Sequence, residues 1–191
     1  MRKVIDVSAF QKDIDYEAVV ASGVTGVIIK ISEGCEYEDT FLSHLSRAQA
    51  VGLDIGVYCY SHATTADRAI EEANEVIYLL NKSGALCSLG IWFDMEDKKV
   101  LNSNDPTGVA TSFISHCNDS GLWAGIYASL STFTDILDLH QIADYVPYWC
   151  AQYDSRCNFA DYFPTKTLAG WQYSDSQYIG DTNVDLNEWY D

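Results

Sequence analysis

Residues 89–96 read LGIWFDME, and this stretch decides the fold because its apolar run leads directly into two carboxylates. The apolar part is continuous rather than alternating, which is typical of parallel strands that helices cover on the sheet's outer face. Side chains in a strand alternate with a period of two residues, so Asp94 and Glu96 point to the same side. The stretch therefore predicts a buried parallel strand that ends in a pair of carboxylates.

Seven other runs of apolar, β-branched and aromatic residues lie on both sides of this stretch. Runs of this composition and length, bounded by turn residues, are typical of strands. The chain is therefore expected to form eight strands, the other seven being residues 3–8, 26–32, 54–60, 123–129, 146–153, 167–173 and 184–190.

The spacers between these strands predict five helices and then none. Apolar residues recur at helical spacing in residues 15–22, 37–51, 64–81, 105–121 and 131–139. The clearest stripe lies within residues 64–81 and consists of Ala66, Ala69, Ile70, Ala73, Ile77 and Leu80. Residues 154–166 and 174–183 are rich in turn residues and are too short for a helix with two connections. The order predicts an α/β fold of five strand–helix units followed by three strands, in one domain over residues 1–191.

Composition excludes several kinds of partner. The 191 residues include 11 Lys+Arg and 28 Asp+Glu, which gives a net charge of −17. This charge argues against binding to nucleic acid and to an anionic membrane surface. The chain has no run of the ~18 apolar residues that a membrane span needs, and no apolar stretch of ~7–15 residues at its start that would act as a secretory signal.

Cysteine and histidine patterns give no indication of a metal or a cofactor. Neither a C-x-x-C pair nor histidines at zinc-site spacing occur, so the six cysteines are expected to be mostly free, buried thiols. Glycine-rich nucleotide-binding loops are also missing. We expect His44 and His116 to lie on the surface of helices, and His62 to be a candidate for the mouth of a site.

Four carboxylates fall at strand positions where a site would form. Asp6 interrupts an apolar strand in Ile5-Asp6-Val7-Ser8, and Asp185 does the same near the end of the chain. In an α/β barrel the site lies at the carboxyl ends of the strands. If the barrel closes, the first and last strands become neighbours, and Asp6, Asp185, Asp94 and Glu96 form one cluster.

Such a cluster suits acid catalysis on a glycan. Two adjacent carboxylates cannot both ionise freely, so one pKa rises, as a general acid near neutral pH requires. Paired carboxylates are the usual machinery of glycosidases. Nearby aromatic side chains fit sugar rings, although about half of them are expected to be ordinary core. For Lys30, an ion pair with Glu33 or another carboxylate is favoured over direct substrate binding.

Taken together, these elements resemble the glycoside hydrolase family 25 lysozymes, also called Chalaropsis-type N-acetylmuramidases. The resemblance covers nearly the whole chain in the family's order and implies an irregular TIM-like barrel of five β/α units followed by three strands. The matching elements are Ile5-Asp6-Val7-Ser8 with Gln11, Ile29-Lys30-Ile31-Ser32-Glu33-Gly34, Gly56-Val57-Tyr58-Cys59-Tyr60, Asp94-Met95-Glu96, Ala124-Gly125-Ile126-Tyr127, Trp149-Cys150-Ala151-Gln152-Tyr153, Trp171-Gln172-Tyr173 and Val184-Asp185-Leu186-Asn187.

The resemblance implies hydrolysis of the β-1,4 bond between N-acetylmuramic acid and N-acetylglucosamine in peptidoglycan, without cofactor or metal. It makes Glu96 the general acid and Asp94 the assisting carboxylate, with Asp6 and Asp185 orienting or tuning the pair. The nucleophile is either Asp94 or the substrate's own 2-acetamido group. An acid pair two residues apart on one strand favours the route through the acetamido group. Both routes retain configuration. The residues expected to contact the sugars are Tyr58, Tyr60, Tyr127, Gln152 and Trp171, with Lys30 and Glu33 beside them.

Two other functions are compatible with the same pattern: a non-catalytic barrel that binds cell-wall glycan, and a glycosidase for another N-acetylated glycan such as chitin. For the lysozyme, the biological setting is expected to be the cell wall. A protein without a signal peptide would be made in the cytoplasm and released by a holin, as phage endolysins are. A domain excised from a secreted autolysin fits equally well.

Overall fold

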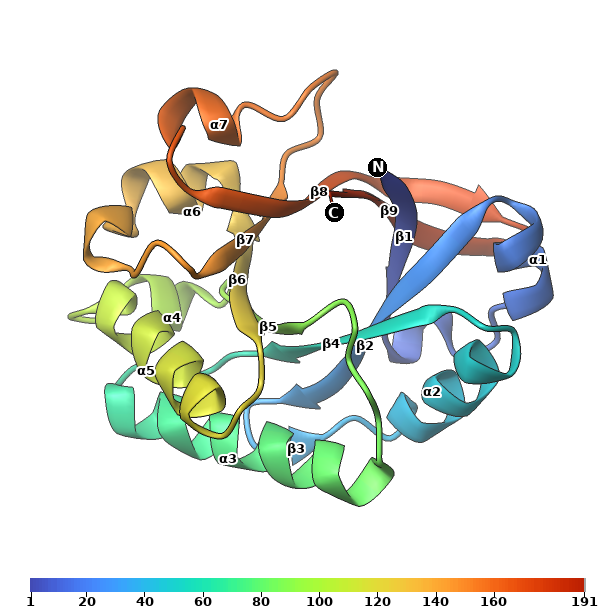
Figure 1. Ribbon diagram of the computed structural model, residues 1–191, viewed down its shortest axis with the longest axis horizontal. Coiled ribbons are helices and arrows are strands. Elements are labelled where there is room, and N and C mark those ends of the chain that lie inside the picture. The colour runs from blue at the N-terminus through green and yellow to red at the C-terminus, as the bar shows by residue number, and fades with distance from the viewer. Residues whose placement is uncertain (191) are drawn as a thin grey trace.

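Eight strands form a closed barrel in the computed structural model, which describes residues 1–190 (Figure 1). They follow the order β1-β9-β8-β7-β6-β5-β4-β2 around the ring, and the pairing of β1 with β2 closes it. All eight predicted strands are confirmed, with bounds Arg2–Val7 (β1), Val24–Glu33 (β2), Asp54–Tyr60 (β4), Ile91–Asp94 (β5), Ala124–Ser129 (β6), Pro147–Ala151 (β7), Thr167–Ile179 (β8) and Thr182–Trp189 (β9). A two-residue strand, β3 (Glu36–Tyr37), extends the sheet beside β2.

The direction of the last strand brings the chain's two ends together. Strands β1, β2 and β4 to β8 are parallel to their neighbours in the ring, whereas β9 runs antiparallel to both β8 and β1. The carboxyl ends of the parallel strands and the amino end of β9 therefore share one rim. In this register Asp6 lies directly opposite Asp185.

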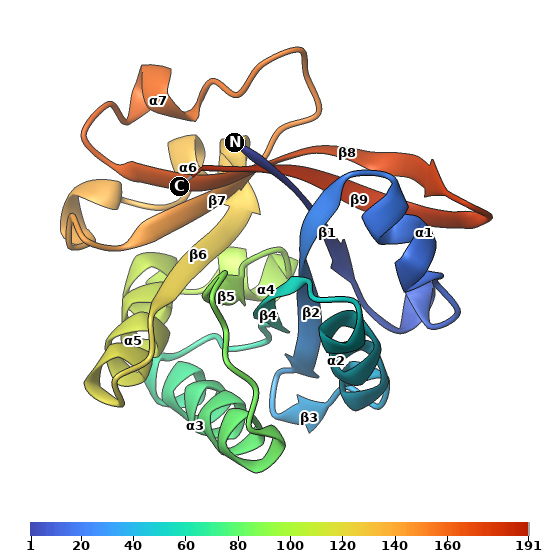
Figure 2. The ribbon, with the colours of Figure 1, turned by 45° about the vertical axis from the view of Figure 1, so that its right-hand side comes forward.

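Helices cover the barrel unevenly. The five predicted helices are present as α1 (Tyr16–Ala21), α2 (Phe41–Ala50), α3 (Ala66–Ser83), α5 (Pro106–Asp119) and α6 (Leu130–Asp135). Figure 2 shows α2, α3 and α5 around the outside of the ring, while β8 and β9 cross the opposite side. None of the helices among residues 1–190 is both long and apolar enough to span a membrane.

The sequence did not predict four short helical elements that lie between the strands. One-turn helices occur at α4 (Lys98–Leu101) and α7 (Phe159–Tyr162), and 3-10 turns at η1 (Ala9–Gln11) and η2 (Leu139–Gln141). The expectation that helices stop after residue 139 is therefore wrong for α7. A single turn escapes detection because its four residues are too few to show a helical period.

Residues 174–183, the second turn-rich spacer, were expected to form a loop, but most of them belong to strands. There β8 and β9 continue as a hairpin that turns at Gly180, whose φ of 59° lies in the left-handed region. Asp, Asn and Gly have low strand propensity, so composition indicated a loop. Cross-strand pairing to the partner strand overrides that preference.

The lower part of the barrel interior is filled by indole rings. Trp92 and Trp189 pack edge to face at 5.2 Å between ring centroids, and Trp92 lies 5.9 Å from Trp149. Glycines on neighbouring strands make room for them. A Cβ at Gly125 would come within 2.5 Å of the Trp92 ring, and one at Gly170 within 2.3 Å of the Trp189 ring. These two strand positions accept no side chain without repacking.

Two polar side chains are buried where the sequence did not indicate it. His44 of α2 is buried rather than on the surface, and its ring contacts the Tyr16 hydroxyl at 2.9 Å and the Ser8 carbonyl oxygen at 3.0 Å. Glu72 lies on the buried face of α3, where it accepts hydrogen bonds from Ser61 Oγ (2.7 Å) and His62 N (3.0 Å). Both side chains tie a helix to the segment that follows a barrel strand.

The buried stripe of α3 differs from the predicted one for the same reason. It consists of Ala69, Glu72, Ala73, Val76, Leu79 and Leu80, while Ile70 and Ile77 are only partly buried. Because Glu72 is charged, the sequence pattern does not count it as part of the buried face, and the apolar stripe read from the sequence is displaced from that face.

The six cysteines are free in the structure, with Cys59, Cys117 and Cys150 buried.

Candidate active site

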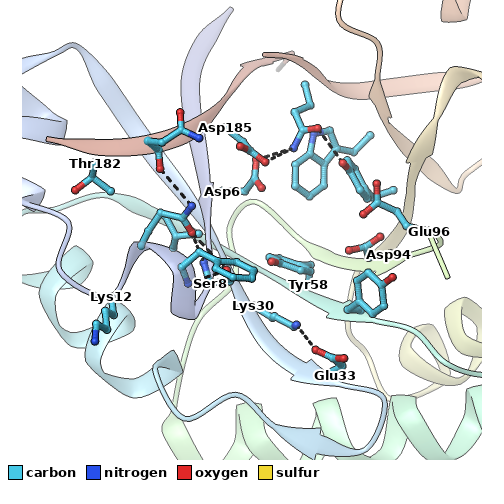
Figure 3. A pocket seen from close by; sticks show the side chains of 18 of the residues that line it. Asp6, Ser8, Lys12, Lys30, Glu33, Tyr58, Asp94, Glu96, Thr182 and Asp185 are labelled. Carbon is cyan, nitrogen blue, oxygen red and sulfur yellow. Dashed lines mark hydrogen bonds and ion pairs between the residues drawn. The ribbon is translucent and has the colours of Figure 1, made fainter. Parts of the chain in front are cut away.

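A cavity of about 1040 Å³ opens at the rim where the parallel strands end (Figure 3). It is lined from the ends of β1, β2, β4 and β5, from β6, β7, β8 and β9, from the segment after β1, and from the turn of the β8–β9 hairpin. Of the eleven residues that the sequence pointed to, nine line this cavity: Asp6, Lys30, Glu33, Tyr58, Tyr60, Asp94, Glu96, Tyr127 and Asp185.

The two-residue period of the strands places these side chains in the cavity. Trp92 points into the barrel, so Asp94 follows on the same side, one step nearer the rim. Glu96 lies two residues beyond the end of β5 and lines the same cavity. On β1, Val4 points inward and Asp6 follows it in the same way. The apolar layer and the carboxylates above it are therefore consecutive positions on the same strand faces.

Asp6 and Asp185 share one hydrogen-bond donor. Asp6 is buried, and its Oδ2 accepts hydrogen bonds from Asn187 Nδ2 at 2.8 Å and from Gln172 Nε2 at 3.1 Å. Gln172 Nε2 also donates to Asp185 Oδ2 at 3.2 Å. Burial raises the pKa of Asp6 to about 6, against the lowering effect of Asn187 and Gln172. Burial and the neighbouring Asp6 raise the pKa of Asp185 to about 8.

One carboxyl oxygen of Asp94 accepts no hydrogen bond from the described residues. Its side chain is buried, and Oδ1 has no hydrogen-bond partner among residues 1–190. Burial, then Glu96, then Asp6 raise the pKa of Asp94 well above its usual value. A buried carboxyl oxygen without a partner is costly in a folded protein, so this atom is available to a ligand.

Glu96 lies beside Asp94 at the open side of the cavity (Figure 3). Although its side chain reaches solvent, the protein around it raises its pKa, and the charge of Asp185 adds to this effect. The nearby Tyr127 hydroxyl opposes this upward shift in pKa. A carboxyl group with a raised pKa that faces a cavity has the properties of a general acid.

Charged side chains at the mouth form a chain of ion pairs. Lys30 Nζ lies 2.6 Å from Glu33, which confirms the ion pair suggested by the sequence. His62 bridges Glu33 at 3.1 Å and Asp97 at 2.5 Å, and it lines the cavity. Partial burial lowers the pKa of His62, but the two hydrogen bonds outweigh it, so the net shift is upward. This series of ion pairs connects the ends of β2 and β4 to Asp97, the residue after Glu96.

Two predicted sugar-contacting residues lie outside the cavity lining. Trp171 is buried and donates its indole N–H to the Gln152 carbonyl oxygen at 2.7 Å. The Gln152 side chain accepts from Asn158 N at 2.7 Å. Both residues brace the connection between β7 and β8 beside the site.

Two buried amides, Gln172 and Asn187, and the buried indole of Trp149 line or support the site. The sequence places all three in the matching motifs, but they were not among the residues expected to form the site. Gln172 and Trp149 line the cavity, and Asn187 supports Asp6 from below. The two-residue period carries the signal for the amides, because Gln172 follows the inward-facing Gly170 and Asn187 follows the inward-facing Asp185. Phe10 also lines the cavity, at its outer end, where it is 93% exposed. Among the described residues no group of His, Cys, Asp and Glu is arranged to hold a metal ion.

Comparison with known proteins places this geometry in a family. Residues 5–182 match the model described as glycosyl hydrolases family 25. A curated relative, the autolytic lysozyme of Clostridium acetobutylicum, is 29% identical over 193 residues, which cover 97% of this chain and 55% of that protein. The chain thus spans about half the length of the curated relative it matches.

Solved structures have the same fold over the whole chain. The catalytic domain of the endolysin ply40 from bacteriophage P40 of Listeria monocytogenes superposes with a TM-score of 0.83 at 25% identity, covering 100% of this chain and 93% of that one. The modular autolysin LytC from Streptococcus pneumoniae, solved with a synthetic peptidoglycan ligand, gives a TM-score of 0.85 at 22% identity. That match covers 99% of this chain and 46% of LytC, and at this identity it shows the fold alone.

Proposed function

The chain belongs to glycosyl hydrolases family 25, and we propose that it is the catalytic domain of a lysozyme. It cleaves the β-1,4 bond between N-acetylmuramic acid and N-acetylglucosamine in peptidoglycan, with retention of configuration. The observation that carries this proposal is the pair Asp94 and Glu96, which leave one strand end on the same side and line one cavity. The name of the curated relative and the peptidoglycan ligand of LytC support the substrate.

Glu96 protonates the oxygen of the leaving sugar. This role needs a carboxyl group that is still protonated near neutral pH, and the surroundings of Glu96 favour that form. Its position at the open side of the cavity leaves room for the glycosidic oxygen beside it.

Asp94 assists from below the sugar ring. The positive charge that develops at the anomeric carbon favours the carboxylate form of Asp94, whose Oδ1 has no partner among residues 1–190. We favour the route in which the substrate's 2-acetamido group attacks the anomeric carbon and Asp94 stabilises the charged intermediate. Direct attack by Asp94 is the alternative, and it needs carboxyl groups ~5–5.5 Å apart.

The remaining cavity residues hold the glycan. Tyr58, Tyr60 and Tyr127 offer aromatic faces for sugar rings, and the Lys30–Glu33 pair lies at the mouth. Asp6 and Asp185 tune the acid from the far side. We propose that the protein acts on the bacterial cell wall, as part of an endolysin or of an autolysin.

The test compares Glu96→Gln with the wild type on a suspension of Gram-positive cell walls. We expect turbidity clearance to fall by at least about 100-fold, because the acid is lost while size and shape are kept. Glu17→Gln, an exposed change on α1 outside the cavity, is the matched control and should clear walls normally. A Glu96→Gln protein that clears walls at the wild-type rate would remove Glu96 from the mechanism.

The products identify the bond. Mass analysis of reduced digestion products should show new reducing ends on N-acetylmuramic acid. New reducing ends on N-acetylglucosamine, or cleavage of chitin without cleavage of walls, would contradict the proposed specificity. Binding to walls without any cleavage would instead indicate a glycan-binding barrel.

A further inference from the structure

The cavity continues beyond the carboxylates into an outer arm between the η1 turn and the turn of the β8–β9 hairpin. The side chains that line this outer arm are those of Phe10, Lys12, Asp13, Asp181 and Thr182. In Figure 3, Lys12 and Thr182 lie at the end of the cavity opposite Glu96. The whole cavity, at about 1040 Å³, reaches the upper end of the range for sites that take one small ligand. It therefore has room for more sugar rings than the one beside the acid pair.

Phe10 presents an open aromatic face in this outer arm. The side chain is 93% exposed, and of the exposed large apolar side chains among residues 1–190 it is the one that lines the cavity. Single exposed apolar residues are ordinary on protein surfaces, so exposure alone assigns no role. Its place in the cavity wall distinguishes Phe10 from exposed aromatic residues such as Tyr78 and Tyr162, which lie on helices outside the cavity.

Hydrogen bonds on both sides of Phe10 hold its backbone in place. Ser8 caps the η1 turn, since its Oγ accepts from Phe10 N at 3.3 Å and its carbonyl oxygen accepts from Gln11 N at 3.0 Å. The same carbonyl oxygen accepts from His44 Nε2 of α2 at 3.0 Å. Gln11 Nε2 donates to the Asn183 carbonyl oxygen at 3.2 Å, which joins the turn to the hairpin. A ligand that packs on Phe10 therefore does not have to order the backbone beneath it.

The polar groups of the outer arm suit a sugar better than a peptide stem. The carboxylates of Asp13 and Asp181 accept hydrogen bonds, and the Thr182 hydroxyl both donates and accepts, as the hydroxyl groups of a sugar require. The C–H face of a sugar ring packs on an aromatic ring while its hydroxyl groups point outward to such partners. Peptide stems of peptidoglycan contain carboxylates. Two acids against the one amino group of Lys12 disfavour a negatively charged stem in this arm.

We propose that Phe10 forms a further sugar-binding subsite in the outer arm of the cavity. The subsite takes a hexosamine ring of the same glycan strand, beyond the two sugars that the cleaved bond joins. The identity of this ligand rests on the proposed function. Contacts made so far from the reacting bond are equally strong in the ground state and in the transition state, so they lower KM on long strands and leave kcat unchanged.

Stem-free peptidoglycan oligosaccharides of increasing length test the subsite. We expect kcat/KM of the wild type to increase from the shortest oligosaccharide that is cleaved to the octasaccharide, because only long chains reach the outer arm. Phe10→Ala should lower kcat/KM on the octasaccharide by roughly 10-fold, through KM, and leave the shortest substrate unaffected. Phe10→Trp keeps an aromatic face and should retain the preference for length. Tyr162→Ala, which removes an exposed ring on α7, is the matched control.

The dependence on length distinguishes a subsite from a structural role. An equal loss on substrates of every length, or no loss on the octasaccharide, would overturn the proposal. A loss in Phe10→Ala that occurs only on strands with peptide stems would assign the outer arm to the stem instead of a sugar.

Binding measured without cleavage separates this inference from the proposed function. In a Glu96→Gln background, calorimetry should show that Phe10→Ala weakens octasaccharide binding by roughly 10-fold. If the wild type cleaved no glycan but this difference were found, the subsite would stand and the proposed function would fail. If the wild type cleaved walls but Phe10→Ala bound the octasaccharide as tightly as its parent, the subsite would be rejected. A parent that does not bind the octasaccharide would reject it as well.

Discussion

The lower and upper layers of the barrel interior lie on the same strands, yet they contain opposite kinds of side chain. The lower layer is mostly apolar and includes Val4, Ile28, Trp92, Trp149 and Trp189, with the buried amide of Asn187 opposite Val4. The upper layer lies one inward-facing position nearer the rim and consists of Asp6, Lys30, Asp94, Tyr127, Gln172 and Asp185. A step of two residues along a strand changes the interior from a packed core to a cavity lined by carboxylates.

The contrast separates a layer that stabilises the fold from a layer that we propose serves the reaction. Removing apolar surface from water contributes about 25 cal/mol per Å², so buried indole rings stabilise the barrel strongly. Buried carboxylates destabilise it unless hydrogen bonds or charges compensate them. Asp94 has an oxygen with no partner among the described residues. The upper layer therefore has a cost in stability that its proposed chemistry explains.

Removal of the central indole should have the largest effect. Trp92→Ala deletes a fully buried ring that contacts Trp149 and Trp189, and it removes the hydrogen bond to the Leu89 carbonyl oxygen. We expect the free energy of unfolding to fall by about 3–5 kcal/mol, measured by urea denaturation. Trp123→Ala, in which the lost ring is 48% exposed, should cost clearly less. Equal losses would mean that the lower layer is not the main support.

Substitution in the upper layer should have the opposite signature. Asp94→Asn keeps the volume but removes the charge, so lytic activity should fall by about 100-fold or more. The melting temperature should stay the same or rise, because a buried group with a raised pKa no longer has to ionise. Both quantities are measured on one preparation, by turbidity clearance and by thermal denaturation. A melting temperature that drops as far as in Trp92→Ala would erase the distinction between the layers.

The smallest expected effect is the pH dependence of stability. Asp185, with a pKa raised from 3.8 to about 8, and Asp6, raised to about 6, bind more protons in the folded protein than in the unfolded chain. Stability is therefore highest at the acidic end of this window and decreases as pH rises from about 4 to about 8. The lowered pKa values of Glu33 and Asp97 act below that window, and the raised pKa of His62 adds to the same trend.

Thermal melting across this pH range checks the expectation. The control is Asp185→Asn, in which the decline should become shallower. A wild-type melting temperature that increases steadily between about pH 5 and about pH 8 would contradict the raised pKa values.

Most of the secondary structure could be predicted from the sequence because most strands contain a near-continuous apolar run and each of the five longer helices has a helical stripe. The failures are local and have physical causes. Glu72 and His44 are polar residues on buried helix faces, where tertiary hydrogen bonds compensate their burial. The β8–β9 hairpin is built from residues of low strand propensity and depends on pairing with its neighbour.

The candidate site was predictable to a similar extent. Acids that interrupt apolar strands are conspicuous, so all four carboxylates could be identified from the sequence, and the structure places all four in the cavity. Gln172 and Asn187 were noted only as parts of strand motifs and were not assigned to the site, because a strand-borne amide acquires a role only from the groups around it. The lining also excludes Gln152 and Trp171, whose side-chain directions at the end of β7 and in β8 could not be read from their motifs.

The sequence by itself determined which residues form strands and which face of each strand carries the acids, because strand periodicity is a local property of the chain. Only the tertiary structure decided that the acids meet. Closure of β1 against β9 brings Asp6 opposite Asp185 across 179 positions of sequence, and the resulting burial raises the pKa of both carboxyl groups. Desolvation and the sharing of a donor such as Gln172 depend on distances in space, which no local pattern encodes.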